Sequence, residues 1–165
     1  ELMVTRHYAQ RDFPFVFTNG IQASYVEVDI ETGFVKLLNH WAVEDCGRVL
    51  NPMLVDEQMR GAIVQGIGGA LYEECLYDDS GSMINASMAD YLVPMASEMP
   101  DIEVAHIQTP TATSKLGAKG AGEAGTAGAP AAVMNAINDA LAPFNVHVHS
   151  QPITPQKILK ALGKV

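Results

Sequence analysis

Residues 21–43 read IQASYVEVDIETGFVKLLNHWAV, and this stretch indicates the architecture of the whole chain. From Ile21 to Ile30 apolar and polar residues roughly alternate, which is the pattern of a strand with one buried face. Glu31-Thr32-Gly33 then supplies a turn, and an apolar run resumes from Phe34 to Val43. We therefore expect a β-hairpin here.

Helix signals follow the hairpin. Asn51-Pro52 has the form of an N-cap with proline at the first helical position, and predicts a helix over much of 52–74. Thr154-Pro155 repeats this form and predicts a short final helix. Residues 131–141 carry apolar side chains at helical spacing and predict another helix, after a loop over 111–128.

Further strands are expected in three places. Asp78-Asp79-Ser80-Gly81 reads as a turn between short strands, and residues 102–107 alternate until Thr109-Pro110 breaks the pattern. Residues 146–149 alternate again. Because a hairpin argues against a purely parallel sheet, residues 1–165 are expected to form a single α+β unit with a mixed sheet and packed helices.

The composition and charge of the chain limit the classes of partner that are expected. Ten basic and nineteen acidic residues give a net charge of -9, which argues against nucleic acid or an anionic membrane surface. Apolar stretches end well short of the ~18 residues of a membrane span. Cys46 and Cys75 lie far apart, which favours a reducing compartment, the cytoplasm. Glu1 is not a start methionine, which favours a chain that begins inside a longer polypeptide.

A glycine-rich loop carries the main functional signal. Between residues 104 and 138 the only Lys, Arg, Asp or Glu residues are Lys115, Lys119 and Glu123. Glycines recur among them and favour a loop whose backbone takes positive dihedral angles and approaches a ligand closely. These glycines are at positions 117, 120, 122, 125 and 128.

Two plainer interpretations of this loop stay open. Lys119 and Glu123, four residues apart, would also suit an exposed helical ion pair worth ~0.3–0.5 kcal/mol. Gly120-x-Gly122-x-x-Gly125 matches a dinucleotide-binding fingerprint, but neither a strand leading into it nor an acidic residue about 20 positions onward is evident.

A second glycine cluster falls inside the predicted helix 52–74. Each of these glycines costs ~0.8–1.0 kcal/mol relative to alanine, so a packing or ligand reason is needed. Gln58 and Gln65 share a helix face with Gly61 and could present amides to one polar ligand. Close packing of the helix on the sheet is the alternative. The cluster consists of Gly61, Gly66, Gly68 and Gly69.

Taken in order, these landmarks resemble the end of the large, molybdenum-binding subunit of the xanthine dehydrogenase, aldehyde oxidase and aerobic carbon monoxide dehydrogenase family. The Lys119-Gly120-Ala121-Gly122-Glu123 run is the most specific of them. The others are Val26-Glu27-Val28-Asp29, Glu31-Thr32-Gly33, Asp45-Cys46-Gly47, Asn51-Pro52, Gln58 with Gly61, Gln65-Gly66-x-Gly68, Asn135-Ala136-x-x-Asp139-Ala140 and Thr154-Pro155.

The resemblance implies roles for single residues. Glu123 would lie beside the molybdenum as the catalytic general base, its proton affinity raised by burial. Gln58 would help to bind the pyranopterin cofactor, with the backbone of Gly120 and Gly122 against the metal's ligands. Lys119, Gln65 and Gly66 are further cofactor-binding candidates. No protein side chain is expected to ligate the metal.

The resemblance also implies an activity and its partners. The chain would be the carboxy-terminal part of a molybdenum hydroxylase, an oxidoreductase that inserts water-derived oxygen at an aldehyde or N-heteroaromatic carbon of a small molecule. The cofactor would be molybdopterin or its cytosine dinucleotide form. Iron–sulfur and flavin groups would lie on partner subunits, and the remainder of the several-fold longer subunit would complete the site, so the isolated chain should be inactive. A non-catalytic nucleotide- or pterin-binding module, or an assembly module, is the alternative.

Overall fold

The computed structural model describes residues 2–8 and 15–165. Within these ranges three strands form one sheet in the order β1-β2-β3. β1 (Asn19–Val28) pairs antiparallel with β2 (Val35–Asp45), and β2 pairs parallel with β3 (Ile102–His106). The hairpin and the mixed sheet confirm the predicted α+β class.

The hairpin turn is closed by Asp29. Its Oδ1 accepts from the Glu31 main-chain nitrogen at 2.8 Å, and its Oδ2 accepts from the Thr32 hydroxyl at 2.8 Å. Gly33 has φ +76°, and the Pro155 backbone fills the space that a Cβ would take there. Only glycine suits that position, which explains the turn predicted at residues 31–33.

A β-bulge sets which side chains of β2 face inward. Tyr25 is opposite Asn39 and Val26 is opposite Leu37, so Leu38 is the extra residue. Because of this bulge both Leu37 and His40 are buried beneath the helices, although they are three residues apart. The bulge therefore lets Leu37 and His40 face the same side of the sheet.

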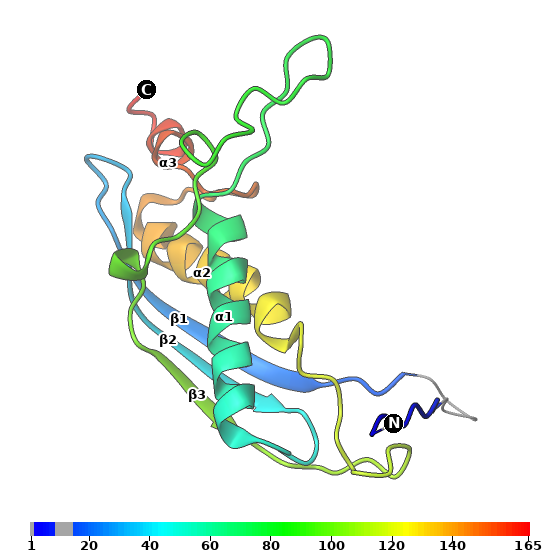
Figure 1. Cartoon of the computed structure of the whole chain (residues 1–165). Helices are drawn as coiled ribbons and strands as arrows, with labels where there is room; N and C mark the ends of the chain where they lie inside the picture. The colour runs from blue at the N-terminus through cyan, green and yellow to red at the C-terminus, as the bar shows by residue number, and fades with distance from the viewer. Residues whose placement is uncertain (1, 9–14) are drawn as a thin grey trace.

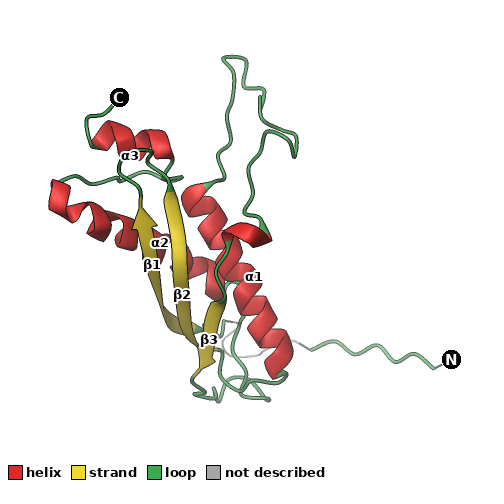
Figure 2. Cartoon of the chain, turned by 90° about the vertical axis from the view of Figure 1, so that its left-hand side faces the viewer, coloured by secondary structure: helices red, strands yellow, loops and turns green. Residues whose placement is uncertain are grey.

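Helices α1 (Pro52–Leu71) and α2 (Ala124–Leu141) lie across one face of the sheet, and the short α3 (Pro155–Ala161) follows near the C-terminus (Figure 1). A quarter turn of the molecule shows α2 passing behind β1 and β2, with α1 on the right of the strands (Figure 2). The caps are as predicted: Asn51 Oδ1 accepts from the Leu54 nitrogen at 3.3 Å, and the Thr154 side chain accepts from the Lys157 nitrogen at 3.3 Å. Two 3-10 turns, η1 (Ala96–Glu98) and η2 (Ala142–Phe144), complete the elements among the described residues.

The start of α2 differs from the prediction. The helix begins at Ala124, seven residues before the expected Ala131, and includes Pro130. Small side chains let this first part pack on α1: a Cβ on Gly125 would lie 2.7 Å from the Met59 carbonyl oxygen and 2.8 Å from the Ala62 Cβ. Helix–helix contact thus outweighs the poor helix propensity of glycine and proline.

Two predicted strand regions were wrong. Around the confirmed turn at residues 78–81 the described chain forms only a single bridge, Tyr77 to Met83, on a segment that extends beyond the body (Figure 1). Residues 146–149 form no strand, because the Val148 nitrogen donates to Asn138 Oδ1 at 2.8 Å instead of to a neighbouring strand. Alternation alone does not make a strand where no partner strand lies alongside.

The core lies between the helices and the covered face of the sheet. Ile63 and Ile67 of α1 and Val133 and Ile137 of α2 are fully buried there, with Ile102 of β3 beneath them. Among the described residues, no helix has the length and apolar character needed to cross a membrane.

Candidate functional site

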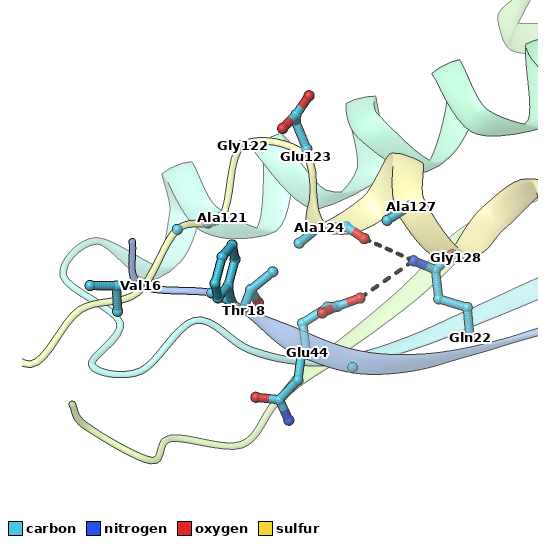
Figure 3. A pocket seen from close by; sticks show the side chains of 14 residues that line it. Val16, Thr18, Gln22, Glu44, Ala121, Gly122, Glu123, Ala124, Ala127 and Gly128 are labelled. Carbon is cyan, nitrogen blue, oxygen red and sulfur yellow. Dashed lines mark hydrogen bonds between the residues drawn. The ribbon is translucent and has the colours of Figure 1, made fainter. Parts of the chain in front are cut away.

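The glycine-rich loop connects β3 to α2 and ends at Glu123, the residue immediately before α2. The Glu123 side chain makes no capping hydrogen bond, so its carboxylate is not consumed in holding the helix. It is exposed, and Figure 3 shows it pointing away from Gln22 and Glu44 on the opposite side of the loop. The burial expected for this residue is not present within the described chain.

Asp45, the last residue of β2, anchors the start of the loop. Its carboxylate pairs with Lys119 Nζ at 3.2 Å and accepts from the main-chain nitrogens of Gly47 at 2.8 Å and Thr109 at 3.1 Å, and from the Thr109 hydroxyl. These donors, the Thr109 hydroxyl foremost, hold the pKa of the Asp45 carboxyl well below its usual range. A buried ionised carboxylate therefore ties the loop to the sheet.

Both the side chain and the main chain of Lys119 are held by hydrogen bonds. Its Nζ also donates to Thr109 Oγ1 at 2.7 Å, and its main-chain nitrogen donates to the Cys46 carbonyl oxygen at 2.7 Å. The ion pair of Lys119 is with Asp45, so the interpretation of Lys119 and Glu123 as an exposed helical pair was wrong. Lys119 therefore holds the loop against the end of β2.

The loop glycines differ in what they require. Of the five, only Gly117 has a positive φ, of +73°, so the positive dihedral angles that these glycines permit are used at one position. Gly122 has no atom within 4 Å of where a Cβ would stand, and Gly120 has only the Val16 carbonyl oxygen at 3.5 Å. Nothing in the described chain explains why these two positions lack side chains.

Gln58 of α1 reaches the loop directly. Its Nε2 donates to the Gly122 carbonyl oxygen at 3.0 Å, one residue before Glu123. Gln58, Gly61 and Gln65 share an exposed face of α1, as their spacing predicts, and a Cβ on Gly61 would meet nothing within 4 Å. Gln65 Oε1 lies 3.4 Å from the Thr126 hydroxyl.

Gly66 is placed differently from these residues. It is buried where α1 meets α2, and a Cβ there would lie 2.8 Å from the Ala129 Cβ. The packing interpretation explains this glycine, although its contact is with a helix and not with the sheet.

A pocket of about 540 Å³ lies on the other side of the loop from the Glu123 carboxylate (Figure 3). Glu44, only 3% exposed, lines it, and burial raises the pKa of its carboxyl. Gly20 gives Glu44 room, because a Cβ there would overlap the carboxylate. The pocket lies between the start of β1 and the loop, and its lining is Val16, Phe17, Thr18, Asn19, Gly20, Gln22, Glu44, Gly120, Ala121, Gly122, Glu123, Ala124, Ala127 and Gly128.

A network of polar side chains, two of them buried (His40 and Glu44) and two half-buried (Gln22 and Ser24), runs behind this pocket. His40 lies between Ser24, whose hydroxyl is 2.9 Å from Nδ1, and Gln22, whose Oε1 is 3.1 Å from Nε2. Gln22 Nε2 then reaches Glu44 and the first turn of α2. These residues were missed, and the signal for them was polar side chains at the inward-facing positions of β1 and β2.

Chemically, the site offers one exposed carboxylate at the end of a loop that is held on both sides. Gln58 and Asp45 fix the loop before Glu123, and α2 continues directly after it. A carboxylate on such a loop can accept or donate a proton, and the backbone that carries it is held in place. Amide groups on the neighbouring face of α1 offer hydrogen bonds to a polar ligand.

Comparison with known proteins gives consistent matches. Residues 1–100 match the family of molybdopterin cofactor-binding domains. Nicotine 6-hydroxylase large subunit of Paenarthrobacter nicotinovorans is 46% identical over 146 residues, which cover 88% of this chain and 18% of that protein. Carbon monoxide dehydrogenase large chain of Afipia carboxidovorans is 34% identical over 133 residues, 81% of this chain and 16% of that protein.

Solved structures agree with these matches. The crystal structure of quinoline 2-oxidoreductase from Pseudomonas putida 86 superposes with a TM-score of 0.86 at 43% identity, covering 89% of this chain and 19% of that one. The chain thus spans less than a fifth of the length of each of these three relatives.

Proposed function

Since the chain belongs to the family of molybdopterin cofactor-binding domains, as its landmarks predict, we propose that it completes the active site of a molybdenum hydroxylase. Residues 1–165 would form one unit of the larger cofactor-binding subunit, with Glu123 as the general base. The observation that carries this proposal is the Glu123 carboxylate, which makes no hydrogen bond or ion pair with the described residues and lies at the end of an anchored loop.

The exposed side of α1 and the loop fits a large polar cofactor. Gly61 and Gly122 leave open space where side chains would otherwise stand, and this space would admit a cofactor. The exposed amides of Gln58 and Gln65 lie on the same side of α1 and offer hydrogen bonds to a pterin. Lys119 and Gly66 would then shape the site through the loop anchor and the helix contact, without touching the cofactor.

When bound, the molybdenum cofactor supplies the two-electron oxidation. In the balanced reaction the substrate carbon exchanges its hydrogen for an oxygen from water, and two protons and two electrons leave. Glu123 accepts a proton at its carboxylate, and the remaining subunit would bury this group and raise its proton affinity. The electrons would pass to iron–sulfur and flavin partners, and from there to an external acceptor.

The relatives favour one class of substrate. Those with the higher identity are named for nicotine and quinoline, both N-heteroaromatic compounds, whereas the carbon monoxide dehydrogenase is less similar. We therefore favour an N-heteroaromatic substrate over an aldehyde or carbon monoxide. A cytoplasmic location agrees with Cys46 and Cys75, which are both free thiols.

Replacing Glu123 by glutamine in the complete enzyme tests the proposal. The amide cannot accept a proton, so turnover of an N-heteroaromatic substrate should fall at least about a thousandfold. Molybdenum content, measured by elemental analysis, should stay unchanged because the side chain is not a metal ligand.

A matched control is Glu27→Gln, which changes an exposed carboxylate on β1, far from the loop in sequence. Its turnover should equal that of the unmodified enzyme. Near-normal turnover of Glu123→Gln with full molybdenum content would contradict the assignment of the general base.

A further inference from the structure

We propose that Gln22 is a positioning residue for Glu123, holding the first turn of α2 so that the carboxylate stays in place. This inference rests on the proposed function of Glu123. It concerns the two residues after Glu123, whereas Gln58 contacts the residue before it.

Gln22 bridges the sheet and the helix. Its Nε2 lies 3.0 Å from the Gly125 carbonyl oxygen and 3.3 Å from the Ala124 carbonyl oxygen, and 3.4 Å from Glu44 Oε1. The bonds to Ala124 and Glu44 are drawn in Figure 3. Ala124 and Gly125 are the two residues that directly follow Glu123.

The partners determine which way the amide points. Main-chain carbonyl oxygens only accept hydrogen bonds, so the NH₂ group of Gln22 must face α2 and its Oε1 must face His40. His40 Nε2 therefore carries a hydrogen and donates it to Gln22 at 3.1 Å. Nδ1 then accepts from the Ser24 hydroxyl at 2.9 Å. Gln22, His40 and Ser24 thus each have a defined donor or acceptor role in this hydrogen-bond network.

These contacts leave Glu123 between two side-chain amides. Gln58 holds the residue before it, at the Gly122 carbonyl oxygen, and Gln22 holds the two residues after it. The fit on the Gln22 side is also steric, because a Cβ on Gly128 would lie 2.9 Å from the Gln22 Cδ. Since the Glu123 side chain has no capping bond of its own, its position depends on these neighbours.

Gln22→Leu in the complete enzyme removes the amide while keeping most of the volume. The amides of residues 121–127 should exchange hydrogen at least about tenfold faster, because two carbonyl oxygens of the first turn lose their donor. The kcat for the hydroxylation should fall about tenfold, with KM changed less than twofold and molybdenum content unchanged.

Gln22→Glu gives a signature that a purely structural role would not produce. An ionised carboxylate there would face the Ala124 and Gly125 carbonyl oxygens and Glu44, whereas a protonated one could donate to them. The titratable groups that face position 22 are Glu44 and His40, and the first turn of α2 adds no acidic side chain. The ratio of variant to unmodified kcat should therefore rise as the pH falls.

Gln151→Leu is the matched control. Gln151 also donates its amide to a carbonyl oxygen of α2, that of Pro130 at 3.3 Å, but this contact lies seven residues beyond Glu123. Its kcat and the hydrogen exchange of residues 121–127 should match the unmodified enzyme. Equal effects from the two leucine variants would overturn the proposal.

Unchanged exchange or unchanged kcat in Gln22→Leu, or a kcat ratio of Gln22→Glu that is flat with pH, would also overturn it. Failure of the proposed function is recognised separately, by normal turnover of Glu123→Gln. In that case hydrogen exchange alone decides whether Gln22 holds the loop.

Discussion

His40 is fully buried between the strands and α2, and burial lowers its pKa from 6.5 to about 4. In the unfolded chain the imidazole takes up a proton below about pH 6.5, whereas in the folded chain it stays neutral until about pH 4. Its contribution to stability is therefore complete above pH 6.5 and is lost as the pH falls. The loss should reach about 3 kcal/mol of unfolding free energy by pH 4.

Urea unfolding of the 165-residue chain between pH 4 and 7 measures this effect. His40→Gln, which has no proton to gain, should show a flatter dependence over the same range. Burial raises the pKa of Glu44, so its protonation stabilises the folded chain as the pH falls, which is opposite to the effect of His40. This contribution is the same in the unmodified chain and in His40→Gln. An NMR titration of His40 in the folded chain with a midpoint near 6.5 would contradict the prediction.

At this same scale the sequence revealed only part of the site. Glu123 and Gln58 were predicted as site residues because they sit in short motifs, and the structure joins their positions through Gly122. Gln22 and His40 were missed because their roles depend on contacts across the fold, which single-strand alternation does not contain. Which inward-facing side chains share hydrogen bonds depends on the register and on the bulge at Leu38.

Among the elements, the contact between α1 and α2 depends on Gly125. Gly125→Ala would push its Cβ against the backbone of Met59 and Ile63, so it should lower the unfolding free energy by about 1–3 kcal/mol. Gly61→Ala is the matched control, because its Cβ meets only open space and should stabilise the chain by about 0.8–1.0 kcal/mol. Urea unfolding of the two variants checks both signs, and a stabilised Gly125→Ala chain would refute the packing argument.

The elements themselves were predictable where their signals are local. The hairpin turn and the caps at Asn51 and Thr154 involve residues within a few positions of each other. The early start of α2 was not predictable from its sequence, because glycine and proline disfavour a helix there and only contact with α1 compensates. The strand predicted at residues 146–149 was wrong for the opposite reason, because these residues alternate but no strand lies alongside them in the described chain.

Over the whole molecule, the helices cover one face of the sheet and leave the other uncovered in the described chain (Figures 1 and 2). Ile21, Tyr25 and Trp41 point outward on that face, with 71%, 58% and 38% of their surfaces exposed. Since the chain spans less than a fifth of its relatives' length, we expect the remainder of the subunit to cover this apolar face.

Hydroxyl-radical footprinting of the isolated chain and of the complete subunit tests this expectation. Tyr25 and Ile21 should be oxidised readily in the isolated chain and be several-fold protected in the subunit. Met59, a reactive but fully buried residue, should stay unoxidised in both and so reports that the chain is folded. Equal oxidation of Tyr25 in the two samples would contradict the prediction.

The parallel pairing of β3 with β2 also has a consequence for how the molecule assembles during synthesis. The hairpin involves neighbouring residues and can form as soon as it leaves the ribosome, but β3 is separated from β2 by the whole of α1 and the extended segment after it. The edge of β2 therefore stays unpaired until more of the chain has been made. During that interval β2 is the strand most open to wrong partners, and a chaperone would have most to protect there.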